Sequence, residues 1–540
     1  MAEELLAQAD YVIVGAGSAG CVLADRLSAS GRHQVVLIEA GGRDWSPWIH
    51  IPLGYGKLFD HPRYDWRLKT VPQPQLGGRQ VAVPRGRVLG GSSSTNGLLY
   101  VRGQAEDFDG WAAAGNEGWS FREVLPYFIR SEDQQHGANA FHGAGGPLAV
   151  RDPVATHELA EAFIDAAAEE GIARTEDFNG AAQEGAGYYQ MTVRGVRRCS
   201  TAAGYLRRAR RRPNLRVITD GLAEKILFRE GRAVGVRIQR GDTSFAVEAG
   251  REVILAAGAI ASPQLLMLSG IGPAGALHAM GIGIVADRAA VGVGLQDHLN
   301  VRTSYKCSRA ITMNDRLRGP IGRLLAGVEY VLRGSGPLTV AAGYAGAFYR
   351  SGASEPRPDM QAILLLFSTD RTGKKLLPDS GFMASAYQLR PLSRGAVRLA
   401  SADPREAPVI DPAYLDREED RRTTLGGLKR MQAILAAPAL RPFIADAGEP
   451  PLGCSDDEML AHIRERGSAG HHFVGSCAMG AGEAAAVDPR LRLRGVAGLR
   501  VVDGSVMPSI VSGNTNAAIV MIAEKGADII LEDAERERSR

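Results

Sequence analysis

The chain has 540 residues, more than one hydrophobic core supports, so two or three domains are expected. Its 63 basic and 60 acidic residues leave a net charge of +3, which excludes a nucleic-acid binder driven by charge. The five cysteines show no CxxC pair and no apolar run reaches about 18 residues, which predicts a cytoplasmic protein with free thiols and without a disulfide framework or a membrane span.

The first elements are predicted to form a dinucleotide-binding βαβ unit. Residues 11–14 (YVIV) predict a buried strand, GAGSAG follows at 15–20, and the apolar spacing after it is helical. A second strand at 35–38 (VVLI) ends in Glu39, whose carboxylate suits ribose hydroxyls. The motif does not separate FAD from NAD, but the irregular stretch after Glu39 is typical of flavoproteins. The residues expected at the dinucleotide are Gly15, Gly17, Ser18, Ala19, Gly20, Glu39 and Ala40.

Two later segments combine a buried strand with a helix. Residues 253–272 (VILAAGAIASPQLLMLSGIG) predict a strand, a Gly-Ala turn and a helix capped by Ser262 with Pro263 at its first position. Residues 499–516 (LRVVDGSVMPSIVSGNTN) begin with a strand, and a final helix is predicted at 517–533.

The loop at 84–103 reads PRGRVLGGSSSTNGLLYVRG and is rich in small residues. This loop and the 253–272 segment resemble the two signature regions of the glucose–methanol–choline (GMC) oxidoreductase family, Gly-Arg-x-Leu-Gly-Gly-Ser-Ser and Gly-Ala-x-x-Ser-Pro-x-Leu-Leu-x-x-Ser-Gly-Ile-Gly. The stretches VGVGLQDH (291–298), SRGAVRLASADP (393–404) and 499–516 are similar to the family as well. The resemblance covers nearly the whole chain, and the branch it favours holds choline dehydrogenase-like proteins together with aryl-alcohol and furfuryl-alcohol oxidases.

The resemblance implies an α/β fold in which two insertions interrupt a Rossmann-like FAD-binding domain. The FAD domain is expected to comprise residues 1–155, 195–300 and 465–540. The insertions, 156–194 and 301–464, are expected to form an α+β substrate domain whose antiparallel sheet covers one face of the flavin. These boundaries follow from the resemblance, because the composition shows no clear linker.

FAD is therefore the expected cofactor, and no metal is expected. Some family members attach FAD covalently through a histidine directly before the asparagine of the first signature loop. Here Thr95 precedes that asparagine, which implies noncovalent FAD. Besides the glycine loop and Glu39, the resemblance places at the cofactor Arg87, Gly90, Gly91, Ser92, Asn96, Gly97, Val101, Ala223, Asp503, Gly504 and Thr515.

Two adjacent histidines stand in HHFVGSCAMG (471–480), and the resemblance assigns catalysis to the second. It places His472 beside flavin N5 with Asn514 as its partner, although Phe473 replaces the family's usual proline. A neutral imidazole can accept the hydroxyl proton of an alcohol, and an amide N–H can stabilise the developing alkoxide. The sequence leaves two roles open for His471: it lines the substrate pocket, or it is a structural or solvent-facing residue.

The function implied is oxidation of a primary alcohol to an aldehyde, with proton removal to His472 and hydride transfer to flavin N5. The apolar end of a strand predicted at 358–367 favours an uncharged aromatic or aliphatic alcohol, although such a run is equally typical of a core strand. The residues expected in the substrate pocket are His471, Phe473, Leu366 and Phe367.

Other readings stay open. Choline is an alternative substrate, a lyase similar to hydroxynitrile lyases is a non-redox alternative, and a scaffold that keeps FAD only as structure is a third class. The electron acceptor is either oxygen or a quinone-like molecule, and the sequence leaves the oligomeric state open.

Overall fold

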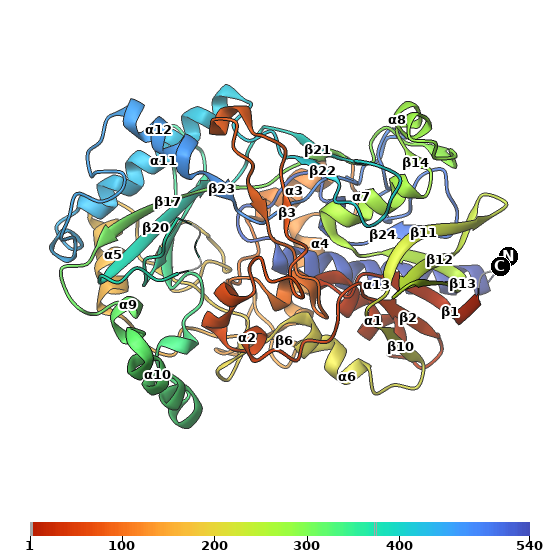
Figure 1. Ribbon diagram of the computed structural model, residues 1–540, viewed down its shortest axis with the longest axis horizontal. Helices are drawn as coiled ribbons and strands as arrows, with labels where there is room; N and C mark the ends of the chain where they lie inside the picture. Colours follow the sequence, from red (N-terminus) through yellow and green to blue (C-terminus); the bar gives the residue numbers. More distant parts are fainter. Residues whose placement is uncertain (1–3, 372, 374, 540) are drawn as a thin grey trace.

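The computed structural model describes residues 4–371, 373 and 375–539. The chain forms two parts that lie side by side (Figure 1). One part is built on a seven-stranded mixed sheet, and both ends of the chain lie beside it. The other part is built on a six-stranded antiparallel sheet. The expected α/β fold is confirmed. No helix in the described part of the chain is long and apolar enough to cross a membrane.

The seven-stranded sheet has the order β10-β2-β1-β13-β12-β11, and β24 pairs with β13. Its strands are β1 (Glu4–Val14), β2 (Val35–Ile38), β10 (Leu215–Ile218), β11 (Leu222–Arg229), β12 (Arg232–Arg240), β13 (Thr243–Leu255) and β24 (Leu499–Val501). β1 pairs in parallel with β2 and with β13. The strands predicted at 11–14 and 35–38 are confirmed, and both are buried, as central parallel strands are.

Helix α1 (Ser18–Ser28) follows β1 after a tight turn at Gly15, whose φ is +98°. A Cβ at Gly20 would lie 1.8 Å from the Gly15 carbonyl oxygen, so only glycine lets the helix pack this close. The first helical bond runs from the Cys21 N–H to the Gly17 carbonyl (3.1 Å). The N–H groups before it are therefore free at the end of the helix.

Helix α7 (Gly258–Leu268) begins earlier than predicted, so Ser262 and Pro263 lie inside it and the expected cap is wrong. Pro263 has no N–H to donate to the Ala259 carbonyl one turn before it. The Ser476 hydroxyl donates to that carbonyl instead, at 2.6 Å. A proline is thus tolerated inside the helix because a residue more than two hundred positions away satisfies the carbonyl.

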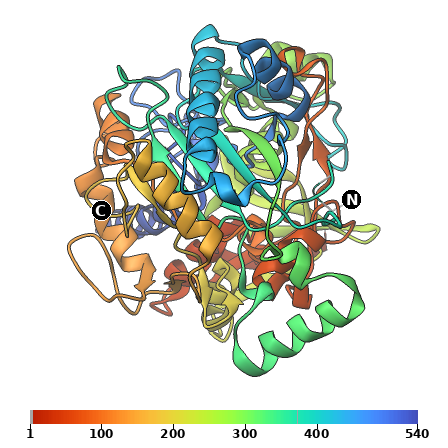
Figure 2. The ribbon, with the colours of Figure 1, turned by 90° about the vertical axis from the view of Figure 1, so that its left-hand side faces the viewer.

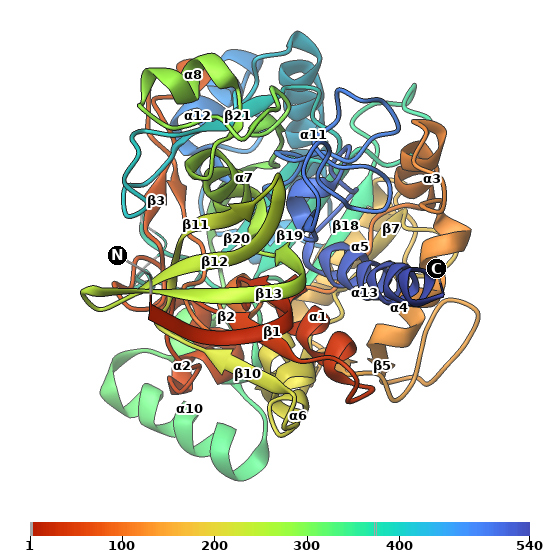
Figure 3. The same cartoon turned by 90° about the vertical axis from the view of Figure 1, so that its right-hand side faces the viewer.

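The final helix is confirmed as α13 (Asn516–Arg538), which packs against α1 and α4 (Phe121–Ser131) (Figure 3). Thr515 occupies the N-cap position, so Asn516 is the first residue of the helix. The Asn516 side-chain oxygen accepts a hydrogen bond from the Ser18 hydroxyl at 2.7 Å. This bond holds the starts of α1 and α13 together.

The six-stranded sheet has the order β23-β17-β20-β19-β18-β7, and every neighbouring pair is antiparallel. Its strands are β7 (Gly185–Tyr188), β17 (Leu299–Lys306), β18 (Ala345–Tyr349), β19 (Met360–Leu365), β20 (Gly381–Gln388) and β23 (Ser468–Ala469). Helices α5 (Glu158–Glu169) and α11 (Glu418–Ala436) pack on this sheet (Figure 2). The strand predicted at 358–367 is confirmed as β19.

The remaining elements are short or peripheral. The helices are α2 (Pro47–His50), α3 (Ala105–Ala113), α6 (Arg207–Ala209), α8 (Ala274–Ala279), α9 (Met313–Arg316), α10 (Gly319–Arg333) and α12 (Asp456–Arg466). The strands are β3 (Leu68–Lys69), β4 (Ala82–Val83), β5 (Glu132–Gln134), β6 (Leu148–Val150), β8 (Val193–Arg194), β9 (Arg197–Arg198), β14 (Ile271–Gly272), β15 (Ala286–Asp287), β16 (Val293–Leu295), β21 (Gly395–Arg398) and β22 (Val409–Asp411).

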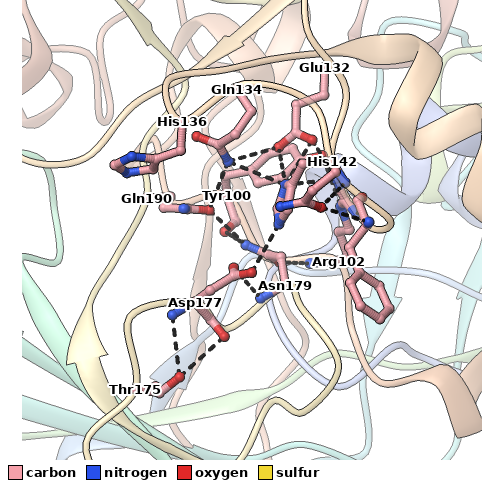
Figure 4. Close-up of polar contacts among 12 residues, drawn as sticks. Tyr100, Arg102, Glu132, Gln134, His136, His142, Thr175, Asp177, Asn179 and Gln190 are labelled. Carbon is pink, nitrogen blue, oxygen red and sulfur yellow. Dashed lines mark hydrogen bonds and ion pairs between the residues drawn. The ribbon is translucent and has the colours of Figure 1, made fainter.

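A buried polar network joins three segments of the chain around His142 (Figure 4). One ring nitrogen of His142 lies 2.9 Å from Glu132 and the other 2.9 Å from Asp177. Arg102 donates to the Glu132 carboxylate (2.6 Å), and its backbone N–H donates to the Asn179 side chain (2.9 Å). Burial acts to lower the pKa of His142, but the bonds to Asp177 and Glu132 outweigh it and raise the pKa to about 9. His142 is therefore a buried cation at neutral pH.

Candidate active site

Two cavities lie next to each other, the first beside the seven-stranded sheet and the second beside the six-stranded sheet. The first, of about 250 Å³, is lined by the turn between β1 and α1, by Glu39 and by the start of α7. The second, of about 200 Å³, is lined by β17, β19 and β20 and by the histidines His471 and His472. The two cavities are adjacent, because both are lined by Ser18, Arg85, Ser92 and Ile519.

Most residues expected at the cofactor line these cavities. The first cavity is lined by Gly15, Gly17, Ser18, Ala19, Glu39, Ala40, Gly91, Ser92, Ala223, Asp503 and Gly504. The second is lined by Ser18, Ser92, Asn96, Gly97 and Thr515. Four of the expected residues line neither cavity: Gly20, Arg87, Gly90 and Val101.

These four residues stand behind the walls. Gly20 lies in the first turn of α1, packed against the Gly15 carbonyl, and Gly90 lies in a turn with φ +88°. The Arg87 guanidinium lies over the ring of Trp66, 4.9 Å from its centroid, and Trp66 lines the first cavity. Val101 is fully buried.

The first cavity fits a dinucleotide such as FAD. The two carboxylate oxygens of Glu39 accept one hydrogen bond each, from the Ala16 N–H (2.9 Å) and the Gly41 N–H (2.8 Å), and each oxygen keeps a lone pair for a ribose hydroxyl. Burial raises the pKa of Glu39 to about 7. A Cβ at Gly17 would meet no atom closer than 4.0 Å, so a ligand has room beside the free N–H groups of α1. A pyrophosphate is the group that such a helix end binds.

Asp503 joins α7 to the C-terminal segment at the wall of the first cavity. One carboxylate oxygen accepts from the Ser262 hydroxyl (2.5 Å) and from the Gly258 N–H (2.8 Å). The other accepts from the N–H (2.8 Å) and the hydroxyl (2.6 Å) of Ser505. These bonds hold the two segments in register, so loss of the carboxylate would disturb the wall from both sides.

Three side chains form a hydrogen-bonded chain at the second cavity. His298 Nε2 lies 2.8 Å from the Leu389 carbonyl, which only accepts, so this nitrogen carries the proton of the neutral ring. Its Nδ1 is then an acceptor, and the His472 Nδ1–H donates to it at 2.9 Å. His472 Nε2 is consequently unprotonated and accepts the Asn514 Nδ2–H at 3.0 Å. The chain of bonds presents a basic lone pair beside an amide donor.

The antiparallel sheet orients the amide of Asn514. Gln361, on β19, donates from Nε2 to the Asn514 side-chain oxygen (3.2 Å), which leaves the Asn514 N–H₂ group directed to the histidine. The Tyr387 hydroxyl, on β20, donates to the oxygen of Gln361 (2.6 Å). The Tyr189 hydroxyl gives its proton to the Ala362 carbonyl (2.7 Å), so it accepts from Gln361 Nε2 (3.1 Å) and fixes which end of that amide is the nitrogen. The Tyr387 ring also stacks on His298, with ring centroids 4.8 Å apart.

Asp297 and Arg85 position the backbone of the two histidines. The Asp297 carboxylate accepts from the His472 N–H (2.5 Å) and from the Tyr414 hydroxyl (2.5 Å). His471 has φ +68°, a left-handed conformation that costs energy in a residue with a Cβ. Arg85 donates to the His471 carbonyl (2.7 Å) and helps to hold this conformation.

The histidines of the second cavity are neutral at physiological pH. Burial lowers the pKa of His298 to about 4. Burial also places the pKa of His472 well below its usual range, and the neighbouring His298, His471 and Arg85 lower it further. His472 is therefore unprotonated at physiological pH.

Of the four residues expected in the substrate pocket, only His471 lines the second cavity. β19 contributes Ile363 and Leu365 to the cavity, whereas the fully buried Leu366 follows Leu365 and is directed away, as alternate residues of an extended chain are. Phe367 lies beyond the end of β19 and is buried in the core.

Phe473 lines the first cavity instead of the second, with the Arg85 guanidinium 5.0 Å from its ring centroid. Besides Tyr387, the second cavity is lined by the aromatic residues Tyr55 and Phe59, whose ring centroids are 5.7 Å apart. Neither was predicted, because both precede the first signature loop in a segment without a motif.

The second cavity contains two arginines and no acid. Arg85 and Arg302 line it, and no Asp or Glu is among the described residues of its wall. Burial lowers the pKa of Arg302, and the nearby Tyr55 hydroxyl only partly offsets this. Arg85 could have been found from its place in the 84–103 loop. Arg302 lies on strand β17, which has no motif, and only the folded sheet brings Arg302 to the cavity.

The chain matches the N- and C-terminal family models of GMC oxidoreductases over residues 9–300 and 391–523. It is 42% identical to oxygen-dependent choline dehydrogenase of Brucella ovis over 97% of this chain and 96% of that protein. It is 41% identical to alcohol dehydrogenase [acceptor] of Pseudomonas putida over 97% and 95%. The crystal structure of pyridoxine 4-oxidase from Mesorbium loti is similar with a TM-score of 0.86 and 32% identity, over 96% of this chain and 98% of that one. The chain therefore belongs to the GMC oxidoreductase family.

Proposed function

We propose that the protein oxidises a primary alcohol to an aldehyde with FAD as the electron acceptor of the chemical step. The observation that carries the proposal is the pair His472 and Asn514, whose Nε2 and Nδ2 atoms lie 3.0 Å apart in a cavity adjacent to the dinucleotide cavity. The alcohol-oxidising activities named for the relatives support the same reaction class.

The chain's own residues supply the proton transfer. An alcohol hydroxyl that displaces the Asn514 amide from His472 Nε2 gives its proton to the imidazole, and its oxygen then accepts the released amide N–H. When bound in the first cavity, FAD supplies the acceptor for the hydride that leaves the carbinol carbon. The imidazolium keeps its Nδ1–H bond to neutral His298, which stabilises the new positive charge.

FAD is held noncovalently in this proposal. Thr95 lines the second cavity at the position where the resemblance places the linking histidine of covalent members, and its hydroxyl cannot form that bond. Acid precipitation should therefore leave the yellow cofactor in the supernatant. Flavin retained in the protein pellet would contradict this part of the proposal.

The substrate is proposed to be an uncharged aromatic or aliphatic primary alcohol rather than choline. The aromatic wall of Tyr55 and Phe59 and the apolar Ile363 and Leu365 suit an uncharged body. A quaternary ammonium would meet Arg302 without a compensating carboxylate among the described wall residues, and two like charges repel each other in a poorly solvated cavity. The electron acceptor that reoxidises the flavin is oxygen or a quinone-like molecule.

The test is anaerobic mixing of the holoenzyme with benzylic, furfuryl-type, medium-chain aliphatic and choline alcohols while the visible absorption of oxidised flavin is followed. Bleaching identifies the substrate class, and the rate at which colour returns in air separates an oxidase from a dehydrogenase. His472→Ala should stay yellow and be reduced about 10²–10⁴-fold more slowly. His278→Ala, on α8 away from both cavities, is the matched control.

Absence of bleaching by every alcohol would favour a non-redox lyase. Near-normal reduction of the His472→Ala variant would contradict the assignment of the base.

A further inference from the structure

Helix α10 exposes an apolar stripe to solvent. Six of its side chains, spaced as one face of a helix, are between 45% and 78% exposed: Ile321, Leu324, Leu325, Val328, Val331 and Leu332. A helix on the surface of a globular protein normally turns such a stripe toward the core. A contiguous exposed patch of large aliphatic residues indicates a surface that is covered by something else.

The opposite face of α10 attaches the helix to the protein. Ala326 is its only fully buried residue, and the Tyr330 hydroxyl donates to the Val196 carbonyl at 2.9 Å. The helix projects from the body in the views of Figures 1 and 3, and Figure 2 shows it standing apart from the packed layers. The apolar stripe therefore faces outward because the polar and small residues are the ones that contact the protein.

The charges around α10 are mostly positive. Residues 312–336 contain four arginines, Arg316, Arg318, Arg323 and Arg333, and two acids, Asp315 and Glu329. Arg316 is paired with Glu329 (2.7 Å), whereas Arg323 and Arg333 form no ion pair with any described residue. An apolar face flanked by arginines is the pattern of helices that lie in the interface of an anionic bilayer.

A second copy of the chain is a weaker candidate for the occupant. In a symmetric dimer each copy presents the same surface to the other, so both sides of the contact would carry the excess of arginine around α10. An anionic bilayer supplies the opposite charge to these arginines.

We propose that α10 docks the protein onto the surface of an anionic lipid bilayer, with the six apolar side chains inserted and the arginines at the headgroups. This proposal does not depend on the reaction proposed above. After α10 the chain passes through the short 3-10 helix Pro337–Thr339 to Ala342, which lines the second cavity. Docking would thus bring the lipid phase close to a wall of that cavity.

The test is co-sedimentation of the holoenzyme with vesicles of phosphatidylcholine and phosphatidylglycerol, compared with pure phosphatidylcholine. The wild type should sediment with the anionic vesicles and be released by salt. Leu324→Gln with Leu332→Gln should weaken binding at least about tenfold, since each substitution removes an inserted aliphatic side chain. Leu392→Gln, at an exposed leucine outside the stripe, should bind as the wild type does.

Flavin content and thermal midpoint confirm that the variants are folded, which is expected because the substituted side chains are exposed. Equal binding of the double variant and the wild type would overturn the proposal, as would absence of binding to either vesicle. A dimer in sedimentation velocity that the double variant dissociates, without vesicle binding, would overturn it in favour of self-association.

Discussion

The Nδ1 atoms of His298 and His472 lie 2.9 Å apart, and the direction of the bond between them is set by a third group. Neutral His298 has one N–H, and it donates this N–H to the Leu389 carbonyl. His472 must therefore donate from Nδ1, which leaves its Nε2 unprotonated. His298 is thus a positioning residue that selects the tautomer of the proposed base.

The first prediction concerns His298. His298→Ala should lower kcat/KM for an alcohol about 10–100-fold with flavin content unchanged, because His472 is then free to adopt the tautomer that cannot accept the proton. His298→Gln offers an amide oxygen to the His472 Nδ1–H and should restore part of the rate. Steady-state kinetics of the two variants provide the measurement. Equal losses in both would indicate a packing role only.

The second prediction concerns the pH dependence of the reaction. Burial and neighbouring groups hold the pKa of His472 well below 6.5, so the free enzyme keeps its base unprotonated as the pH falls through 6.5. The kcat/KM profile should therefore stay flat through this range and fall only at lower pH. A decline centred at pH 6.5 or above in an otherwise stable enzyme would contradict the environment described for His472.

The third prediction concerns stability at alkaline pH. His142 has a pKa of about 9 in the folded protein and about 6.5 when unfolded, so its stabilising contribution is fully present below pH 6.5 and is lost as the pH rises through 9. Its upper limit is about 3 kcal/mol. Urea unfolding at several pH values should show this loss in the wild type. In His142→Gln the free energy of unfolding should be lower at pH 6.5 and should vary less with pH.

The fourth prediction concerns substrate charge. Arg302→Gln should raise kcat/KM for choline relative to benzyl alcohol by about thirtyfold, because a cation about 7 Å from the guanidinium is repelled by roughly 2 kcal/mol at an effective dielectric constant of 20. Lys306→Gln removes the same charge from the same strand at an exposed position and is the control. An unchanged ratio in the Arg302 variant would show that this charge does not select the substrate.

Much of the fold and part of the candidate site could be predicted from the order of residues along the chain. The strand, glycine turn, helix and acid of residues 11–39 are local, and each element obeys rules that act within a few residues. The resemblance then identified the family, and through it the His472 and Asn514 positions that the structure places 3.0 Å apart. Their roles remain proposals that the experiments above test.

Other features depended on contacts between distant segments. His298 and His472 are 174 residues apart, and no spacing rule connects them. Local rules place Pro263 at a helix start. It is accepted inside α7 because the hydroxyl of Ser476, far along the chain, bonds the carbonyl that the proline leaves without a donor. The pleat of β19 directs Ile363 and Leu365 to the cavity, which an apolar run by itself does not specify.

The sequence by itself thus determined the elements, the dinucleotide motif and the chemical types available for catalysis. The tertiary structure alone decided the tautomer of His472, the charge of the second cavity and the outward face of α10. The physical reason is that propensity and periodicity describe interactions over about one helical turn, whereas protonation, burial and the face that a helix presents depend on whichever segments fold against it.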